Sequence, residues 1–193
     1  RFKTEAEVKA FLEYEAKRLG LGTSFEPIVA SGKNASMQHH KPENNRLNKG
    51  FCVIDFGIKY KNYNSDMTRT IYIGKPSIKE KKIYYFLLGM QKNIIKSLKI
   101  NEICDKIYKN AKKELKSCSK YFIHGLGHGV GIKVHELPNL TEKSKDKMQK
   151  NAVFTIEPGI YFKNRFGIRI EDTVLMTNKA FLLTKTTKDL LIV

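Results

Sequence analysis

Two pairs of acidic residues interrupt apolar, β-branched segments, and this pattern limits how the chain can fold. Asp55 ends the run Phe-Cys-Val-Ile-Asp, and Asp66 precedes Met-Thr-Arg-Thr. If residues 51–73 form a hairpin that turns between Tyr60 and Lys61, the two acids face each other. Directly opposed side chains in a hairpin have Cβ atoms about 4.5–5.5 Å apart. Like charges at that distance are unfavourable unless a cation lies between them.

The same arrangement recurs further along the chain. Glu157 lies in Val-Phe-Thr-Ile-Glu-Pro-Gly, and Glu171 lies in Gly-Ile-Arg-Ile-Glu-Asp. A hairpin that turns at Asn164 sets these two acids opposite each other. A bulge at Pro158 and Gly159 would shift that register by one residue.

Ion pairing with arginine is the structural alternative for each acid taken alone, because buried acids are usually paired. Arg69 and Arg169 are close enough in the sequence to be such partners. Two arginines would then serve four acids. The two pairs together therefore favour a site that binds cations.

The histidines support a metal site. All five fall in two short stretches, His39–His40 and His124–His135. Glycines at positions 125, 127, 129 and 131 disfavour a helix in the second stretch, so it is not the helical His-Glu-x-x-His zinc motif. Val130 stands where a dinucleotide fingerprint needs its third glycine. The glycines would instead let the backbone approach a ligand closely.

Four carboxylates and one imidazole carry a formal charge of about −4, which two divalent cations would neutralise. Oxygen-rich ligation favours Mn²⁺, with Co²⁺, Fe²⁺ or Zn²⁺ as alternatives. Two-metal sites with ions about 3.5–4 Å apart activate a bridging water and polarise a carbonyl. The expected reaction is the hydrolysis of an amide or ester.

Composition disfavours several other classes of function. The formal net charge of +17 suggests a nucleic-acid partner, but only six of the 36 basic residues are arginine, and no RNP, zinc-finger or basic-zipper pattern occurs. We expect a solvated lysine-rich surface instead. No apolar run approaches the roughly 18 residues of a membrane span, so no membrane partner is expected. The wide spacing of Cys52, Cys104 and Cys118 favours a reducing compartment, and we expect the protein in the cytoplasm.

The hydrophobic pattern predicts an α+β fold, with helices packed against a largely antiparallel sheet. A helix is predicted over Thr4–Leu19, with a capping box of Thr4 and Glu7 and an apolar stripe that includes Phe11. Strands are expected over 27–31, 51–56 and 67–73, and helices from Ser77 and from about residue 101. The remainder is expected to form strands and turns, with a short helix within 141–150.

Seven motifs occur in order along the chain: Phe-Glu-Pro-Ile-Val-Ala-Ser-Gly, Val-Ile-Asp-Phe-Gly, Ser-Asp-Met-Thr-Arg-Thr, His-Gly-Leu-Gly-His-Gly-Val-Gly, Val-His-Glu, Thr-Ile-Glu-Pro-Gly-Ile-Tyr and Arg-Ile-Glu-Asp. As a set they resemble the Xaa-Pro aminopeptidases and Xaa-Pro dipeptidases (prolidases), which are metallopeptidases of type M24. The resemblance runs from about residue 4 to the end. It implies the pita-bread fold, a curved antiparallel sheet covered by helices, and a centre with two metal ions.

The resemblance also implies roles for individual residues. The metal ligands would be five side chains with oxygen and nitrogen donors: Asp55, Asp66, His128, Glu157 and Glu171. The substrate-binding residues would be His39, His124, His135, Tyr161 and Arg169. His39, His135 and Glu157 would be catalytic, and Glu157 would shuttle a proton between the bridging water and the leaving proline nitrogen. Arg169 would orient a ligating carboxylate.

Two features depart from the family's usual pattern. Gln38 precedes His39 where the family often has proline, and Phe51-Cys52 replaces a common Gly-Asp-like stretch. Full-length relatives also carry a separate N-terminal domain and are commonly dimers. Residues 1–193 are therefore expected to be the C-terminal catalytic domain without its opening helices and the N-terminal domain, and the full-length protein is expected to be a homodimer.

The sequence thus predicts an Xaa-Pro aminopeptidase. It would hydrolyse the Xaa-Pro bond at the N-terminus of peptides whose second residue is proline, with a metal-bridging hydroxide as nucleophile. An Xaa-Pro dipeptidase is the alternative. A non-catalytic binding module on the same fold is less favoured, because such modules typically lose the ligands that this chain keeps. Methionine aminopeptidases lack the Ile-Glu-Pro-Gly-Ile-Tyr and Arg-Ile-Glu-Asp combination, and creatinase-like relatives usually have the ligands replaced.

Overall fold

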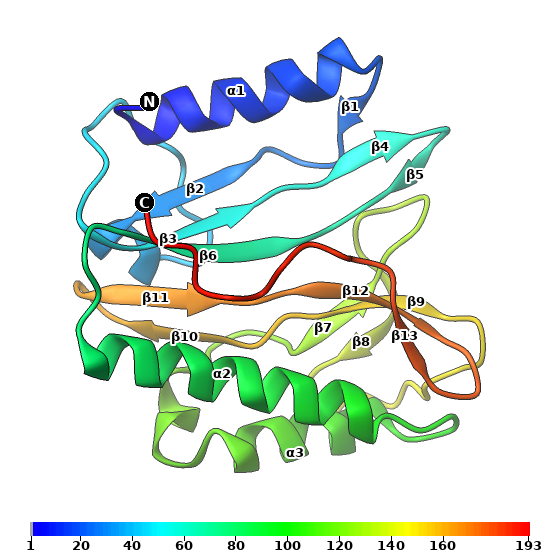
Figure 1. The fold of residues 1–193 in the computed structure, drawn as a ribbon. Coiled ribbons are helices and arrows are strands. Elements are labelled where there is room, and N and C mark those ends of the chain that lie inside the picture. The colour runs from blue at the N-terminus through cyan, green and yellow to red at the C-terminus, as the bar shows by residue number, and fades with distance from the viewer. Residues whose placement is uncertain (1) are drawn as a thin grey trace.

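The computed structural model describes residues 2–193, and its first half combines one long helix with short antiparallel strands (Figure 1). In chain order its elements are α1 (Glu5–Arg18), β1 (Gly22–Thr23), β2 (Ile28–Ser31), the 3-10 helix η1 (Gly32–Ser36), β3 (Gly50–Asp55), β4 (Ile58–Tyr60), β5 (Tyr63–Asn64) and β6 (Thr68–Ile73). The strands form two sheets, in the orders β2-β3-β6 and β1-β4-β5. The three strands expected in this half are present.

The second half begins with two helices and continues as antiparallel strands. Its elements are α2 (Ile78–Ser97), α3 (Cys104–Glu114), the 3-10 helix η2 (Lys116–Tyr121), β7 (Gly127–Gly129), β8 (Glu136–Leu140), β9 (Val153–Ile156), β10 (Gly159–Phe162), β11 (Phe166–Arg169), β12 (Asp172–Met176) and β13 (Ala180–Leu182). The strands form a sheet of order β13-β12-β9-β7-β8 and the hairpin β10-β11. The predicted α+β class is confirmed.

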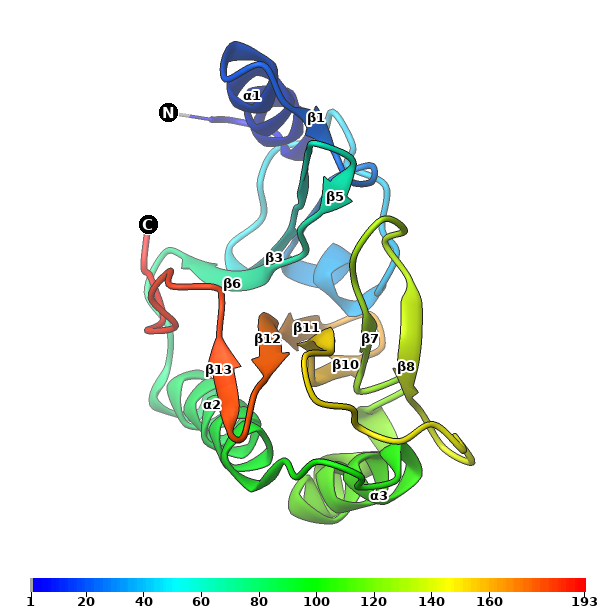
Figure 2. The same cartoon turned by 90° about the vertical axis from the view of Figure 1, so that its right-hand side faces the viewer.

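The α-helices lie on the outside of both halves. In Figure 2, α1 lies at the top beside β1, α2 and α3 lie at the bottom, and the strands lie between them. The main core joins side chains of α2 and α3 to both sets of strands, with Phe51, Tyr84, Leu87 and Phe154 fully buried. Burial of such side chains is the main favourable contribution to folding.

Backbone contacts hold the two halves together. Strand β11 packs against β3 and η1. The backbone N–H of Glu171 donates to the carbonyl oxygen of Thr68 at 3.1 Å, and the N–H of Arg169 donates to Thr70 Oγ1 at 3.1 Å. These bonds bring the end of one acid-bearing hairpin against the other.

The first hairpin turns one residue later than predicted. Lys61 and Asn62 form its turn with φ angles of 47° and 69°, and Tyr60 pairs with Tyr63. Two residues in the left-handed region are typical of a type I′ turn, in which asparagine is favoured. Asp55 therefore pairs with Thr68 rather than with Asp66. Because the shift is two positions, Asp66 stays on the same side of the sheet as Asp55.

The second hairpin has the predicted register. Gly159 pairs with Arg169 on one side of the acids, and Ile156 pairs with Asp172 on the other. Both pairings belong to one continuous register, so Glu157 lies opposite Glu171 with no bulge between them. The turn at Asn164 has φ 58°.

Three local predictions are wrong. Thr4 Oγ1 accepts the N–H of Glu7, but the Glu7 carboxylate accepts the N–H of Lys3 rather than that of Thr4, so the capping box is only half formed. Phe11 is 44% exposed, and α1 buries Glu5 and Ala16 instead of an apolar stripe. Residues 141–150 form turns and a β-bridge to Ile103, with no helix.

Two structural findings concern the apolar segments and the cysteines. Among residues 2–193, no helix has both the length and the apolar character to cross a membrane. The thiols of Cys52, Cys104 and Cys118 are all free. Burial raises the pKa of Cys52 and of Cys104 to about 12, so these two thiols are neutral and poor nucleophiles.

Candidate active site

A cavity of about 670 Å³ lies between the two halves. Nine of the ten residues singled out from the sequence line it: His39, Asp55, Asp66, His124, His128, His135, Glu157, Arg169 and Glu171. The tenth, Tyr161, lies behind the wall and contacts two of the nine through its hydroxyl. The structure thus brings together residues that are up to 132 positions apart in the sequence.

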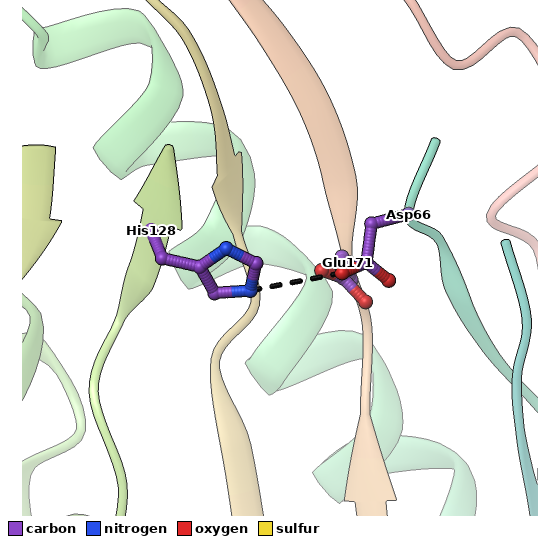
Figure 3. Close-up of side chains that lie close together, drawn as sticks. All are labelled: Asp66, His128 and Glu171. Carbon is purple, nitrogen blue, oxygen red and sulfur yellow. Dashed lines mark ion pairs between the residues drawn. The ribbon is translucent and has the colours of Figure 1, made fainter. Parts of the chain in front are cut away.

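Three buried side chains form the closest cluster of metal-binding atoms. One ligand atom from each of Asp66, His128 and Glu171 lies within 4.8 Å of the other two. Figure 3 shows the His128 ring directed toward both carboxylates, each supplied by a different part of the chain. His128 Nε2 is 3.6 Å from Asp66 Oδ2 and 3.4 Å from Glu157 Oε1.

A backbone contact sets the orientation of the His128 ring. Nδ1 lies 3.0 Å from the carbonyl oxygen of Gly129, which accepts the proton on that nitrogen. Nε2 therefore presents its lone pair to the carboxylates, as a metal-binding imidazole does. Burial lowers the pKa of His128, which also favours the neutral ring.

The glycines around His128 serve close strand packing. A Cβ atom at Gly127 would lie 1.9 Å from the carbonyl oxygen of Thr155, so only glycine lets β7 approach β9 this closely. That approach brings His128 of β7 to Glu157, which follows β9. The expectation that these glycines admit a ligand is therefore replaced, at position 127, by contact with a neighbouring strand.

Mutual repulsion and burial raise the pKa values of three acids of the cavity. Burial and the charges of Asp55 and Glu157 raise the pKa of Asp66 to about 9. Burial and the charge of Asp55 likewise raise the pKa of Glu157 to about 7, and burial together with Asp66 raises that of Glu171 well above its ordinary value. Without a cation among them, these groups cannot all be ionised near pH 7.

Arg169 is the cation that pairs with one of these acids. Its Nη2 donates to Asp55 Oδ2 at 2.7 Å. The other oxygen of Asp55, Oδ1, is buried without a hydrogen-bond partner in the described part of the chain. A buried carboxylate oxygen without a donor is costly unless a cation accompanies it. Among residues 2–193, no arginine or lysine forms an ion pair with Asp66, Glu157 or Glu171.

The donor set fits divalent metal ions. Asp55 Oδ1 has no partner, His128 Nε2 is free of a proton, and Asp66, Glu157 and Glu171 place further oxygens around the same space. Four carboxylates and one imidazole are ligands that suit Mn²⁺ and similar ions. The five residues that the sequence predicts as ligands all line this cavity, and Asp66, His128 and Glu171 are the three whose ligand atoms lie within 4.8 Å of one another.

Arg169 also orients the pocket behind the acids. Its Nη1 donates to the Tyr161 hydroxyl at 2.8 Å, and that hydroxyl lies 3.0 Å from His124 Nε2. His124 Nδ1 lies 2.6 Å from the carbonyl oxygen of Gly125, so Nε2 accepts the tyrosine proton. Burial, together with the charge of Arg169, lowers the pKa of His124 to about 4 and keeps its ring neutral.

The two histidines expected to bind substrate occupy the cavity wall. The His135 ring lies against that of His128, with centroids 4.2 Å apart. His39 is exposed, follows Gln38 in the segment after η1, and lies close enough to His124 to contribute to its lowered pKa. Both imidazoles can therefore meet a molecule held in the cavity.

Two threonines that donate hydrogen bonds to the acids were not predicted from the sequence. Thr68 Oγ1 donates to Glu171 Oε2 at 2.7 Å and accepts from Arg169 Nε at 3.0 Å. Thr155 Oγ1 donates to Glu157 Oε1 at 3.3 Å. Thr155 precedes Glu157 by two residues in an extended segment, and side chains at that spacing share one face. That spacing is the signal that could have found it.

Arg69 does not serve the acids of the cavity. Its Nη2 donates to Asp172 Oδ1 at 2.8 Å, and its Nη1 donates to the carbonyl oxygen of Glu171 at 2.5 Å. Lys188 also contacts the Asp172 carboxylate. The alternative in which two arginines neutralise four acids is therefore wrong, because only Arg169 contacts one of them.

The fold and this constellation match a known family. Residues 2–178 match metallopeptidase family M24. The chain belongs to this family. It is 41% identical to the Xaa-Pro dipeptidase of Pyrococcus furiosus over 98% of its own length and 56% of that protein.

Solved structures agree with this assignment. The X-Pro aminopeptidase from Thermotoga maritima superposes with a TM-score of 0.94 at 35% identity, over 99% of this chain and 56% of that one. The prolidase from Pyrococcus horikoshii superposes with a TM-score of 0.93 at 39% identity, over 98% and 56%. The chain therefore has the expected pita-bread fold and spans about half the length of the relatives it matches.

Proposed function

We propose that this protein is a metal-dependent peptidase that hydrolyses the bond between a first residue and a following proline. The observation that carries the proposal is the convergence of four carboxylates and one neutral imidazole on one cavity, with a single arginine paired to them. Two divalent ions would balance the charge of the four carboxylates, and Mn²⁺ suits the oxygen-rich donors. Membership of a metallopeptidase family supports the same reaction class.

Of the two related activities, Xaa-Pro dipeptidase is the better supported. The sequence analysis favours an aminopeptidase, with the dipeptidase as its alternative. In structural superpositions, the prolidases of Pyrococcus horikoshii and Pyrococcus furiosus are each 39% identical to this chain, whereas the Thermotoga maritima aminopeptidase is 35% identical. We therefore propose that the dipeptide Xaa-Pro is the preferred substrate.

The side chains of the cavity can perform the proton transfers of this reaction. Asp55, Asp66, His128, Glu157 and Glu171 would hold the ions, which polarise the scissile carbonyl and activate a water when bound. Glu157 can take a proton from the attacking water and deliver it to the proline nitrogen as that nitrogen leaves. His39 and His135 can donate hydrogen bonds to the carbonyl oxygens of the peptide.

The remaining cavity wall suits a small substrate with an apolar ring. Its apolar residues are Phe25, Pro27, Ile28, Pro42 and Val134. A cavity of about 670 Å³ is within the usual range for small ligands, roughly 300–1,000 Å³. Both features are compatible with a proline-containing dipeptide or a short peptide.

The experiment combines metal uptake with a choice of substrates. The chelator-stripped protein is titrated with Mn²⁺ and then assayed with Xaa-Pro and with Xaa-Pro-Xaa. We expect two ions per molecule and faster hydrolysis of the dipeptide, with both lost in Asp66→Asn. Faster cleavage of the tripeptide would favour the aminopeptidase. Two bound ions with no cleavage of either peptide would contradict the proposed activity.

A binding module on this fold would behave differently in the same experiment. It would show no turnover, and Asp66→Asn would leave its partner binding intact. The expected Zn²⁺, Co²⁺ and Fe²⁺ alternatives are compared by repeating the assay with each ion. The homodimer, the cytoplasmic location and the catalytic-domain boundaries expected from the sequence stay predictions.

A further inference from the structure

Glu5 is a buried acid outside the carboxylate cluster. It lies in the first turn of α1 and is 1% exposed, although Phe11 of the same helix is 44% exposed. Acids are rarely buried unless they are well paired. In the described part of the chain its one ion-pair partner is His40, which is also buried.

The Glu5 carboxylate connects several segments that are distant in sequence. Oε1 accepts from the backbone N–H of Ser31 at 2.7 Å, from Ser31 Oγ at 2.9 Å and from Asn34 Nδ2 at 3.2 Å. Oε2 accepts from His40 Nε2 at 2.7 Å and from the backbone N–H of Glu43 at 3.2 Å. One side chain thus joins α1 to the end of β2, to η1 and to both ends of the segment 40–43.

The segment that Glu5 holds forms one wall of the candidate active site. Residues 38–42 line the cavity and have no helix or strand of their own. Besides the Glu5 contacts, few hydrogen bonds fix this wall. Arg169 Nη1 donates to the carbonyl oxygen of Gln38 at 3.2 Å, the N–H of His40 donates to that of Met37 at 3.3 Å, and the N–H of Ala6 donates to that of Glu43 at 3.1 Å. The contact between His40 and Glu5 is the side-chain contact next to His39 that ties this segment to α1.

The Glu5–His40 contact is a strong one by its chemistry. Burial alone would raise the pKa of Glu5, but hydrogen bonds from Ser31 and His40 hold it below its ordinary value, so the carboxylate is ionised. Hydrogen bonds to an ionised acceptor are about twice as strong as those between neutral groups. The N-terminal turn of α1 also favours a negative charge.

We propose that Glu5 and His40 are a positioning pair that fixes segment 38–42 and thereby holds His39 at the wall of the cavity. Neither residue is one of the proposed metal ligands, and Glu5 lies behind the cavity wall, whereas His40 is part of that wall. Its consequence for peptide hydrolysis rests on the proposed function, because His39 matters there only if the cavity binds a peptide. Its effect on the position of His39 does not depend on the proposed function.

The test follows the histidines by NMR in the metal-free chain labelled with ¹⁵N-histidine. Glu5→Gln keeps the shape of the side chain and removes its charge. Glu7→Gln is the matched control, because Glu7 lies in the same helical turn and its exposed carboxylate accepts one hydrogen bond from residues 2–193, from the N–H of Lys3. Resonances are assigned with His39→Gln and His40→Gln.

We expect Glu5→Gln to shift the resonances of His40 and also those of His39, whereas Glu7→Gln moves neither. His40→Gln should shift His39 in the same way, from the other side of the pair. Unchanged His39 resonances in a folded Glu5→Gln chain would overturn the proposal. If both Glu5→Gln and His40→Gln fail to fold while Glu7→Gln folds, the pair is a requirement for folding and the positioning role is likewise wrong.

A kinetic comparison separates this proposal from the proposed function. With Mn²⁺ stoichiometry unchanged, Glu5→Gln should lower kcat/KM for Xaa-Pro about 10-fold or more, whereas Glu7→Gln should match the wild type. Equal kcat/KM in both variants would contradict the positioning role. If the wild-type protein binds metal and cleaves no proline peptide, the proposed function is wrong. The NMR comparison then still tests whether Glu5 and His40 position His39.

Discussion

Arg169 donates to one oxygen of Asp55 at 2.7 Å, and the second oxygen of that carboxylate is buried with no partner among residues 2–193. The guanidinium thus fixes the plane of the carboxylate and leaves its free oxygen available to a cation. The same guanidinium holds Tyr161 and Thr68. A single buried side chain therefore orients both a proposed ligand and the hydroxyl that contacts His124.

Replacing Arg169 tests that orienting role. Arg169→Lys keeps the charge but loses the planar fork that reaches Asp55, Tyr161 and Thr68 together. We expect a 10–100-fold loss in Mn²⁺ affinity or kcat/KM, as is usual when a partner that orients a metal ligand is removed. Arg165→Lys, in the exposed part of the same hairpin, is the control and should match the wild type. Equal metal affinity in both variants would show that Asp55 needs no orienting group.

Asp66→Asn should abolish metal binding without unfolding the protein. The pKa of Asp66 is about 9 in the metal-free chain, so its carboxyl is largely protonated at pH 7 and resembles the neutral amide of asparagine. We expect the metal-free Tm to change by less than about 3 °C. Mn²⁺ at 100 times its Kd stabilises a protein by about 2.7 kcal/mol, and this gain should be lost in the variant. Thermal unfolding with and without Mn²⁺ measures both; an unchanged Mn²⁺ effect would exclude Asp66 as a ligand.

The sequence predicts much of this site because strand periodicity acts locally. The period of two in residues 153–157 and 167–171 places Glu157 and Glu171 on one side of their hairpin, and the turn at Asn164 sets their register. The first hairpin differs because the turn at Lys61 and Asn62 sets the pairing two positions away from the predicted one. The side chains are nevertheless assigned to the correct face of the sheet, because a register shift of two residues keeps each side chain on the same face.

What the sequence does not reveal are contacts between distant segments. Glu5 resembles any acid in the first turn of a helix, which the helix dipole alone would explain. Its burial depends on hydrogen-bond donors 26 to 38 residues away, including His40, and no local sequence pattern predicts these contacts. Arg69 likewise has several acids near it in sequence, and only the tertiary fold selects Asp172.

The stability conferred by Mn²⁺ should increase with pH. Burial raises the pKa of Asp66 from 3.8 to about 9 and that of Glu157 from 4.5 to about 7. A raised pKa contributes stability that is complete below the ordinary value and is lost as the pH rises toward the folded value, so the metal-free fold weakens between about pH 4 and pH 9. Mn²⁺ binds the ionised carboxylates and releases their protons.

The difference in Tm with and without Mn²⁺ should therefore be larger at pH 8 than at pH 5.5. Thermal unfolding at both values, in the same buffer and ionic strength, measures it. Asp66→Asn is the control, since Asp66 has the higher pKa of these two groups, and its removal should flatten the pH dependence of the metal-free protein. A metal effect that is equal at the two pH values would contradict ionised carboxylates as the ligands.

Asp172 should be essential to stability although it lies outside the cavity lining. It is fully buried, and its carboxylate accepts from Arg69, Lys188, Thr184 and Gln91. Asp172→Asn would leave two largely buried cations without their counter-charge, a change that typically costs about 3–5 kcal/mol. We expect a fall in Tm of about 10 °C or more at pH 7. The exposed Asp189→Asn is the matched control and should change little.

The pH dependence of that difference gives an independent check on the cause. Burial would raise the pKa of Asp172, but the hydrogen bonds from Lys188 and Thr184 and the charge of Arg69 lower it overall. A lowered pKa contributes stability that is present above the ordinary value of 3.8 and is lost as the pH falls through the folded value. The gap in Tm between wild type and Asp172→Asn should therefore narrow below about pH 4. A gap in Tm that stays constant down to acid unfolding would mean that packing, and not the charge of Asp172, sets the stability.

Because Arg69 also holds the backbone carbonyl of Glu171, Asp172→Asn should weaken Mn²⁺ binding, whereas Asp189→Asn should leave Mn²⁺ binding intact.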